Sequence, residues 1–227
     1  MNIIIIGAAG KMGQNVAKIA SLEGHNIVGF IDNQFENNKV SADGAVFSNN
    51  IFDVSKKADV IIDFSTAELR TDFIKFAKND SINYCCFSSN LSEFDKQQLK
   101  ELSNTNRVLI CSNSSASMVV FKMLAEIVLK ELPKSQACLT EIHNKNKKDA
   151  PSGTALMIKN IFDVNNHKLQ IASFRAANVC GEHKLSFFLD DEELTLSHKI
   201  SDRNVFARGA ISLAIDLMKK PIGFYEM

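Results

Sequence analysis

The sequence lacks the features that would mark several specialised classes of protein. Its 227 residues carry 26 lysines and arginines against 26 aspartates and glutamates, so the formal net charge is zero. A neutral chain does not attract nucleic acid or an anionic membrane as a whole, so we expect neither as a partner. No apolar run approaches the ~20 residues of a membrane-spanning helix. The start, Met1 to Gly7, lacks the basic segment and cleavage site of a signal peptide, so we expect a cytoplasmic protein.

Cysteine and histidine are few and widely spaced. The five cysteines form no Cys-x-x-Cys pair and are odd in number, so we expect reduced, mostly buried thiols. The five histidines show no metal-ligand spacing, so we expect no metal site. The cysteines are Cys85, Cys86, Cys111, Cys138 and Cys180, and the histidines are His25, His143, His167, His183 and His198.

The first 111 residues alternate apolar runs with helical patterns. Asn2–Ile6 is a continuous β-branched run, typical of a strand buried on both faces of a parallel sheet. Further strands are predicted at 26–31, 58–64, 82–87 and 107–111, and helices at 12–22, 73–77 and 91–102. Strands that alternate with helices predict βαβ crossovers and therefore a parallel sheet.

The pattern changes after residue 114, which indicates a second lobe. Helices are predicted at 118–132, 152–162 and 202–220, and strands at 136–142, 168–176, 183–190 and 193–200. The short connections between the last three strands favour a mixed or antiparallel sheet. We expect an α/β protein with a larger parallel-sheet domain and a smaller α+β domain.

A glycine loop, Gly7-Ala8-Ala9-Gly10-Lys11-Met12-Gly13, lies between the first strand and the first helix. Glycines at this junction permit a tight turn, close approach of the backbone to a pyrophosphate, and close packing of helix on strand. Asp32 follows the second strand, where a carboxylate can bind the hydroxyl groups of an adenine ribose. The loop therefore predicts a dinucleotide site. The alternative is a structural turn with Asp32 as a loop cap.

The residues near Asp32 favour NADH over NADPH. The carboxylate would repel a 2′-phosphate, and Asn33 and Gln34 follow it in place of arginine. Lys11 in the glycine loop can still offer a cation, so NADPH is the second candidate.

The segment from Glu141 to Ala155 carries the strongest chemical signal. Pro151 and Ser152 favour the start of a helix, so we expect the N–H groups of Gly153 and Thr154 to lie at a helix N-terminus, where they can bind a carboxylate. Lys147 adds a cation, and His143 can act as a general acid near neutral pH. The residue pattern alone also fits a solvated lysine loop with a surface histidine.

This segment resembles the His-x-x-x-Lys-x-Asp-Ala-Pro-Ser-Gly-Thr-Ala signature of the 4-hydroxy-tetrahydrodipicolinate (dihydrodipicolinate) reductase family. The glycine loop, Val60 to Ser65, Arg175 with Gly181-Glu182-His183, and Ser197 to Ala210 resemble further family blocks in the same order. The resemblance covers essentially the whole chain. It implies NAD(P)H-dependent reduction of 4-hydroxy-tetrahydrodipicolinate, with loss of water, in the diaminopimelate route to lysine.

The resemblance also implies domains and residue roles. Residues 1–114 and 204–227 would form a Rossmann-type dinucleotide-binding domain, and residues 115–203 a substrate-binding domain whose open mixed sheet builds a homotetramer. His143 would be the general acid and Lys147 its catalytic partner, with Asn144, Gly153 and Thr154 at the substrate. The implied cofactor-binding residues are Gly7, Ala8, Ala9, Gly10, Lys11, Met12, Asp32, Phe87, Ser88, Ser89, Cys111, Ser112, Asn113 and Ser114.

Three segments depart from the family pattern. Asn113-Ser114-Ser115 replaces the usual Asn-Phe-Ser after the fifth predicted strand. Asn144 and Asn146 stand where the family often has histidines, and Phe87-Ser88-Ser89-Asn90 replaces the usual Gly-Thr-Thr-Gly near the nicotinamide. These departures leave open an inactive dinucleotide-sensing protein. A second alternative is another two-domain dicarboxylate dehydrogenase, similar to aspartate dehydrogenase. A serine hydrolase is not favoured, because the Gly-x-Ser-x-Gly elbow is missing.

Overall fold

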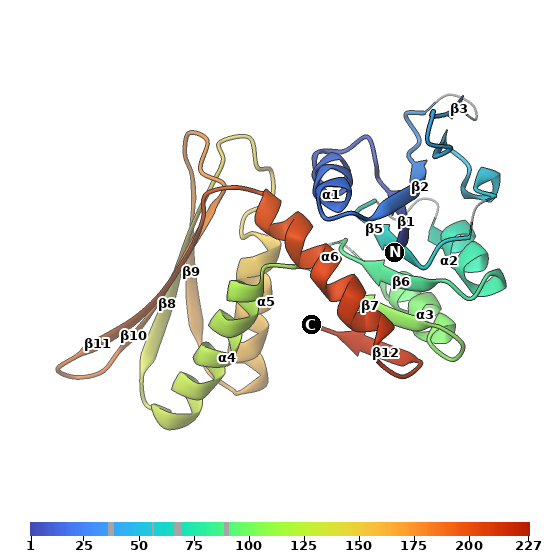
Figure 1. Cartoon of the computed structure of the whole chain (residues 1–227). Helices are drawn as coiled ribbons and strands as arrows, with labels where there is room; N and C mark the ends of the chain where they lie inside the picture. Colours follow the sequence, from blue (N-terminus) through green and yellow to red (C-terminus); the bar gives the residue numbers. More distant parts are fainter. Residues whose placement is uncertain (36–38, 56, 66–69, 89–90) are drawn as a thin grey trace. The chain divides into compact units, whose positions relative to one another are not determined.

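The computed structural model divides into two compact units, both drawn in Figure 1. Unit 1 comprises Met1–Ser114 and Asn204–Met227, and unit 2 comprises Ser115–Arg203. The structure describes residues 1–35, 39–55, 57–65, 70–88 and 91–227. Among these residues no helix combines the length and the apolar character needed to cross a bilayer.

Unit 1 is built on an eight-stranded sheet with the order β12-β7-β6-β5-β1-β2-β4-β3. Neighbouring strands are parallel except at the edge, where β3 pairs antiparallel with β4. The strands are β1 (Asn2–Ile6), β2 (Asn26–Ile31), β3 (Lys39–Val40), β4 (Val46–Ser48), β5 (Val60–Asp63), β6 (Asn83–Cys86), β7 (Arg107–Ile110) and β12 (Gly223–Glu226). This confirms the predicted parallel sheet.

Helices bury both faces of this sheet, which explains the continuous isoleucine run of β1. Ile3 and Ile5 pack in one core cluster with α1 (Lys11–Leu22) and α6 (Asn204–Met218). Ile4 and Ile6 pack in another cluster with α2 (Arg70–Asn79) and α3 (Glu93–Leu102). Because both faces are dry, each strand position needs an apolar side chain, and no alternation with polar residues arises.

Four short elements of unit 1 were not predicted from the sequence. They are β3, β4, the 3-10 helix η1 (Ile51–Asp53) and β12. The first three lie in the polar stretch after Asp32, where runs of two or three residues show no periodicity. β12 follows α6 and adds a parallel strand beside β7, with Phe224 opposite Val108.

Unit 2 holds a four-stranded mixed sheet with the order β11-β10-β8-β9. The strands are β8 (Gln136–His143), β9 (Leu169–Arg175), β10 (Gly181–Phe188) and β11 (Glu193–Ile200). β10 and β11 form the predicted antiparallel hairpin, whereas β9 pairs in parallel with β8 and not with β10. The segment between β8 and β9, which contains α5 (Gly153–Val164), is therefore a crossover connection.

Two helices cover one face of this second sheet. α4 (Ala116–Glu131) and α5 share a core cluster with the inward residues Leu139, Leu185 and Phe187. The opposite face carries half-exposed residues such as Phe174 and Phe188. This arrangement confirms the predicted open mixed sheet.

Gly13 allows α1 to pack directly on the glycine loop. A Cβ atom at this position would lie 2.3 Å from the Gly7 carbonyl oxygen and 2.6 Å from the Ala8 Cα. Both obstacles are backbone atoms, so a side chain can fit only if α1 moves away from β1. We expect Gly13→Ala to destabilise the protein by about 1–3 kcal/mol in urea unfolding. Lys18→Ala, an exposed change on the same helix, should stay within about 0.5 kcal/mol of the parent protein. Equal stability of the two variants would contradict this packing argument.

Candidate active site

The glycine loop of unit 1 has the backbone conformation that its glycines permit. Gly7 has a φ of +76°, in the left-handed region that favours glycine. The N–H groups of Gly7 and Ala8 donate to the carbonyl oxygen of Ile31, at 2.9 and 3.2 Å. Gly10 is the N-cap of α1 and supplies no side-chain cap, so the N–H groups of the first turn remain available to an anion.

Asp32 lies at the carboxyl end of β2 and holds this loop. One carboxylate oxygen accepts from the N–H of Ala9 at 3.0 Å, and the other accepts from the N–H of Gln34 at 3.0 Å. Each oxygen of a carboxylate has a second lone pair, so these bonds leave acceptor capacity for ribose hydroxyl groups. Asp32 therefore caps the loop, and it also faces a cavity.

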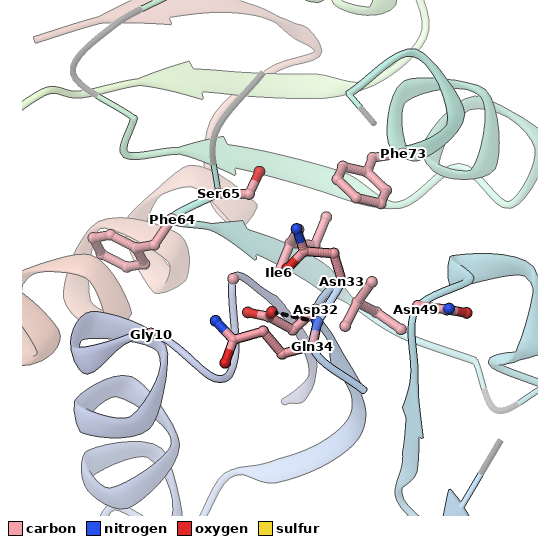
Figure 2. A pocket seen from close by; sticks show the side chains of 11 residues that line it. Ile6, Gly10, Asp32, Asn33, Gln34, Asn49, Phe64, Ser65 and Phe73 are labelled. Atoms are coloured by element: carbon pink, nitrogen blue, oxygen red, sulfur yellow. Dashed lines mark hydrogen bonds between the residues drawn. The ribbon is translucent and has the colours of Figure 1, made fainter. Parts of the chain in front are cut away.

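That cavity has a volume of about 260 Å³ and lies at the carboxyl ends of β1, β2 and β5. Figure 2 shows Asp32, Asn33 and Gln34 on one side and Phe64, Ser65 and Phe73 among the other lining residues. The lining residues are Ile6, Gly7, Gly10, Ile31, Asp32, Asn33, Gln34, Asn49, Phe64, Ser65 and Phe73. An apolar floor with a carboxylate and a glycine loop at its rim suits the adenosine half of a dinucleotide. The residues present therefore fit this cofactor.

Phe87, which stands where the family usually has a glycine, is part of the core. Its ring is 6% exposed and stacks on Phe64 with the ring centroids 5.0 Å apart. Phe64 also lines the cavity, so this stack joins the ends of β5 and β6. The next predicted cofactor residue, Ser88, is half-buried. Ser89 and Asn90 lie outside the described residues.

A buried ion pair fixes the ends of these two strands. The Asp63 carboxylate accepts from Arg70 Nε at 3.3 Å and from the Tyr84 hydroxyl at 2.7 Å, and also from the N–H of Ser65. Arg70 Nη2 donates to Ser88 Oγ at 3.0 Å, and the Ser88 hydroxyl donates to the carbonyl of Ser65. The side chains of Asp63 and Arg70 are both buried. Their hydrogen bonds hold Ser65 and Ser88 in place at the ends of β5 and β6.

The predicted residues after β7 serve partly to position α6. The Cys111 thiol is buried and donates to the carbonyl of Asn113, and the Ser114 hydroxyl donates to the carbonyl of Phe206 at 2.8 Å. A Cβ at Gly209 would overlap the carbonyl of Ser114, so α6 contacts this segment closely. Asn113 is buried and Ser112 exposed. Of the other predicted residues, Lys11 is exposed and Met12 packs against the core.

His143 of unit 2 is buried beside a carboxylate on its own strand. Glu141 and His143 are two residues apart on β8, so both side chains lie on the helix-covered face of the sheet. His143 Nδ1 is in ion-pair contact with Glu141 Oε2. Gly181 on β10 leaves room for the imidazole, because a Cβ there would lie 3.1 Å from His143 Nε2.

Glu141 is fully buried and ionised. Burial raises the pKa of its carboxyl group, but hydrogen bonds from Ser173 and Arg175, the charge of His143 and a bond from Ser152 outweigh burial and lower the pKa to about 2. Arg175 Nη2 lies 3.0 Å from Glu141 Oε1, and the N–H of Ser152 donates to the same oxygen at 3.2 Å. The negative charge is therefore present throughout the physiological pH range.

The pKa of His143 is below its ordinary value. Burial is the largest cause, and the positive charges of Lys147 and Arg175 act in the same direction. Glu141 opposes them and raises the pKa through its charge and its hydrogen bond. The net effect is a lowered pKa, so the imidazolium of His143 is a stronger acid than that of a solvated histidine.

Two further histidines continue this cluster across the sheet. His183 pairs with Glu141 in register and with His198 on the other side, and its ring lies 5.1 Å from that of His143. Burial lowers the pKa of His183 to about 4, so this residue is neutral at physiological pH. His198 Nε2 lies 2.8 Å from the Ser117 hydroxyl at the start of α4.

Glu141, His143 and His183 bring possible metal-ligand atoms within 4.8 Å of one another. The sequence spacing did not predict this grouping. Both Glu141 oxygens are already engaged by Arg175, Ser152 and His143, so protein contacts account for its arrangement. The absence of a metal site stays a prediction.

Lys147 and the start of α5 lie in the loop that follows His143. Lys147 Nζ forms an ion pair with Asp149 Oδ1 at 2.8 Å, and Asp149 also faces the N–H of Gly153. The side chain of Ser152 caps α5 by accepting from the N–H of Ala155. In this structure, then, a carboxylate of the chain itself sits at the predicted carboxylate-binding groups.

Asn144 has a structural role in the same loop. Its side-chain oxygen accepts from the N–H of Asn146 at 2.9 Å, and its amide donates to Asn178 at 3.3 Å. These bonds shape the turn between His143 and Lys147. A contact of Asn144 with substrate stays a prediction.

The sequence alone did not indicate Glu141 or the roles of Arg175 and Ser173 as functional residues. The signal was present in part, since Glu141 and His143 alternate with apolar residues on one strand and therefore share a face. Arg175 and Ser173 come from β9, which is more than 25 residues away, and single-sequence patterns do not give strand pairing. The same limit concealed the contribution of Phe64 and Phe73 to the cavity of unit 1.

Two family models match consecutive parts of the chain. Residues 1–114 match the family model described as dihydrodipicolinate reductase, N-terminus, and residues 117–227 match the model for its C-terminus. The chain belongs to the dihydrodipicolinate reductase family. This confirms the predicted family and its class, an oxidoreductase that uses a nicotinamide dinucleotide.

Curated relatives agree with the family assignment. The chain is 32% identical to the 4-hydroxy-tetrahydrodipicolinate reductase of Rickettsia canadensis, with 100% of this chain and 97% of the relative covered. It is 30% identical to that of Zymomonas mobilis, with 100% and 95% covered. The aspartate dehydrogenase-like and dinucleotide-sensing alternatives are not favoured.

Solved structures share the fold of this dihydrodipicolinate reductase family member. A dipicolinate-bound dihydrodipicolinate reductase from Paenisporosarcina sp. TG-14 superposes with a TM-score of 0.83 at 19% identity, covering 100% of this chain and 97% of the other. An aspartate dehydrogenase from Thermotoga maritima gives 0.56 at 15% identity, with 98% of each chain covered. The predicted α/β fold is thus confirmed.

The space beside His143 gives a test of the site in this reductase. In Gly181→Val the new side chain would overlap the imidazole, which Glu141 holds from the other side. We expect kcat to fall by about 100-fold, because a displaced catalytic group loses its alignment. Asn160→Val, an exposed change on α5, is the control and should retain parent activity. Parent-like kcat in Gly181→Val would show that the position of His143 does not matter.

Proposed function

We propose that this chain reduces 4-hydroxy-tetrahydrodipicolinate to tetrahydrodipicolinate with loss of water, with His143 as the general acid. The observation that carries this assignment is the buried contact between His143 and the ionised Glu141, on a strand that leads directly into Lys147 and the start of α5. This stretch lies within the region that matches the family model. The reaction belongs to the diaminopimelate route of lysine biosynthesis.

Unit 1 would hold the dinucleotide. The first turn of α1 and the N–H groups of the glycine loop would face the pyrophosphate, and Asp32 would accept hydrogen bonds from the adenine ribose. Ser88, with Ser112 to Ser114 at the neighbouring strand end, would hold the nicotinamide half. When bound, the dinucleotide supplies the hydride for the reduction.

Unit 2 would bind the dicarboxylate substrate. Lys147 and the N–H of Gly153 already face one carboxylate, that of Asp149, so they have the charge and geometry that a substrate carboxylate needs. Thr154 adds a hydroxyl in the same turn of α5. A substrate carboxylate would replace Asp149 at Lys147.

His143 would deliver a proton to the substrate carbon that becomes electron-rich when hydride adds to the ring. Its Nδ1 faces Glu141, so Nε2 is the nitrogen that can donate. Lys147, close enough to lower the pKa of His143, makes the imidazolium a stronger acid. Nε2 of His143 is therefore the atom that would donate the proton.

We further propose that NADH is the preferred cofactor and that the open face of the unit 2 sheet joins copies of the chain into a homotetramer. Asn33 and Gln34 in the cavity carry no positive charge for a 2′-phosphate. The half-exposed Phe174 and Phe188 offer apolar surface for assembly. A cytoplasmic location remains a prediction.

Replacement of the acid tests the catalytic assignment. In His143→Gln we expect kcat to fall by about 10²- to 10⁴-fold with a much smaller change in KM, because proton transfer is lost while binding groups remain. The assay follows NADH oxidation with substrate formed in situ from aspartate semialdehyde and pyruvate. His167→Gln is the control. An unchanged kcat in His143→Gln would remove this residue from the mechanism.

Cofactor choice can be tested at Asp32. The parent protein should show a higher kcat/KM with NADH than with NADPH. In Asp32→Asn the repulsion of the 2′-phosphate is lost, so we expect the NADPH:NADH ratio of kcat/KM to rise by about 10-fold, corresponding to roughly 1.4 kcal/mol. Glu23→Gln, an exposed change at the end of α1, should leave the ratio unaltered. A parent enzyme that prefers NADPH would contradict the assignment.

A further inference from the structure

The side chain of Glu141 contacts the proposed acid, His143, and the residue that caps the start of α5, Ser152. Oε2 faces His143 Nδ1, and Oε1 accepts from Arg175 Nη2 and from the N–H of Ser152. Glu141 itself is 0% exposed, so its carboxylate relies on these partners in place of water. Glu141 therefore connects the proposed acid to the first residues of the proposed carboxylate pocket.

We infer that Glu141 is a positioning residue that sets both the orientation of the acid His143 and the position of the carboxylate-binding start of α5. The inference rests on the proposed function and extends it to a residue that does not itself touch the reacting atoms. Two independent sets of contacts, one on each carboxylate oxygen, carry it.

The first set concerns the acid. The charged and titratable groups that face His143 are Glu141 on β8, Arg175 on β9, His183 on β10 and Lys147 in the following loop. Lys147 and Arg175 disfavour the imidazolium, and His183 is neutral. Within the described part of the chain, Glu141 is the group that favours the protonated form. The contact of Glu141 with Nδ1 also orients the imidazole ring of His143, so that Nε2 lies beside Gly181.

The second set concerns the pocket. Ser152 is the N-cap of α5, and its N–H donates to Glu141 while its hydroxyl accepts from the N–H of Ala155. The bond to Glu141 spans 11 residues of sequence and fixes where α5 begins relative to β8. Gly153 follows directly, so the orientation of its N–H depends on this bond.

Arg175 makes the buried charge tolerable. Its guanidinium pairs with Glu141 and also donates to the carbonyl of Asp149, in the loop that carries Lys147. A buried carboxylate with a paired cation and two further hydrogen bonds can remain ionised. The same arginine thereby ties Asp149, the partner of Lys147, to the Glu141 cluster.

The decisive variant is Glu141→Gln, which keeps the size and one acceptor oxygen but removes the charge. We expect kcat to fall by about 10- to 100-fold through loss of alignment. The alkaline limb of the kcat–pH profile should move to lower pH, because the imidazolium loses its stabilising anion and deprotonates earlier. KM for the substrate should rise, while the dissociation constant for NADH, a ligand of unit 1, should stay unchanged.

Glu126→Gln is the matched control. Glu126 is an exposed glutamate on α4, in the same unit but not on the open face of the sheet. Parent-like kinetics and pH profile are expected. A second comparison uses the double variant Glu141→Gln/His143→Gln. If Glu141 acts on kcat through His143, the double variant should lose little more kcat than His143→Gln alone.

Other results would overturn the inference. An alkaline limb that does not move in Glu141→Gln would show that Glu141 does not act on the ionisation of His143. A double variant whose losses in kcat multiply would show that the two residues act independently. If Glu141→Gln does not fold, Glu141→Asp replaces it: the charge is kept but withdrawn from Nδ1, so kcat should fall and the alkaline limb should move in the same direction by a smaller amount. An unmoved limb together with parent kcat in this variant would also reject the inference.

An NMR titration separates this inference from the proposed function. The imidazole of His143, identified by its absence in His143→Gln, should titrate at lower pH in Glu141→Gln than in the parent protein, whatever the substrate. A parent protein that fails to oxidise NADH or NADPH with the condensation product would reject the proposed function, whereas an unshifted titration would reject the role of Glu141.

Discussion

A buried negative charge on the central part of the unit 2 sheet is the constraint that organises the proposed substrate site. Removing a carboxylate from water costs several kcal/mol unless partners replace its hydration. Glu141 finds these partners in Arg175, Ser152, Ser173 and His143, which come from β8, β9 and the start of α5. Each element must therefore keep its place, since the loss of one partner leaves an uncompensated charge.

Unit 1 uses the same physical device at its own strand ends. Asp63 is buried at the carboxyl end of β5 and pairs with Arg70, which in turn holds Ser88 after β6. In both units a carboxylate at or near a strand end, paired with an arginine, fixes loops that carry proposed binding residues. Interactions between buried polar groups are strong, so clusters of this kind hold the loops in a defined geometry, and a change in one member disturbs the others.

The sequence predicted those parts of the fold that depend on local periodicity. The isoleucines of β1, the hairpin of β10 and β11 and the long helices follow from apolar spacing and were located within a few residues. β12 and the short strands after Asp32 were missed because their runs are too short to show a period. The pairing of β9 with β8 was also missed, since a parallel crossover is decided by tertiary packing.

Within the candidate site, only the residues that belong to sequence motifs were predictable. The glycine loop, Asp32, His143 and Lys147 were identified from their spacing and family resemblance, whereas the partners of His143 come from strands distant in sequence. Phe87 illustrates the remaining limit. In the sequence it is only a departure from a glycine pattern, and its stacking on Phe64 becomes apparent when β5 and β6 lie side by side.

The placement of α6 and β12 has a consequence for the order in which the chain can fold during synthesis. Unit 2 is one continuous segment, so all of its partners are available once residue 203 has been made. Unit 1 is interrupted by unit 2, and one face of its sheet is covered by Ala207, Ala210 and Ile211 of α6. Until these residues emerge, the apolar side chains of β1, β5 and β6 on that face lack their cover. The unit whose first strands are made earliest is thus completed last, and its nascent form exposes apolar surface.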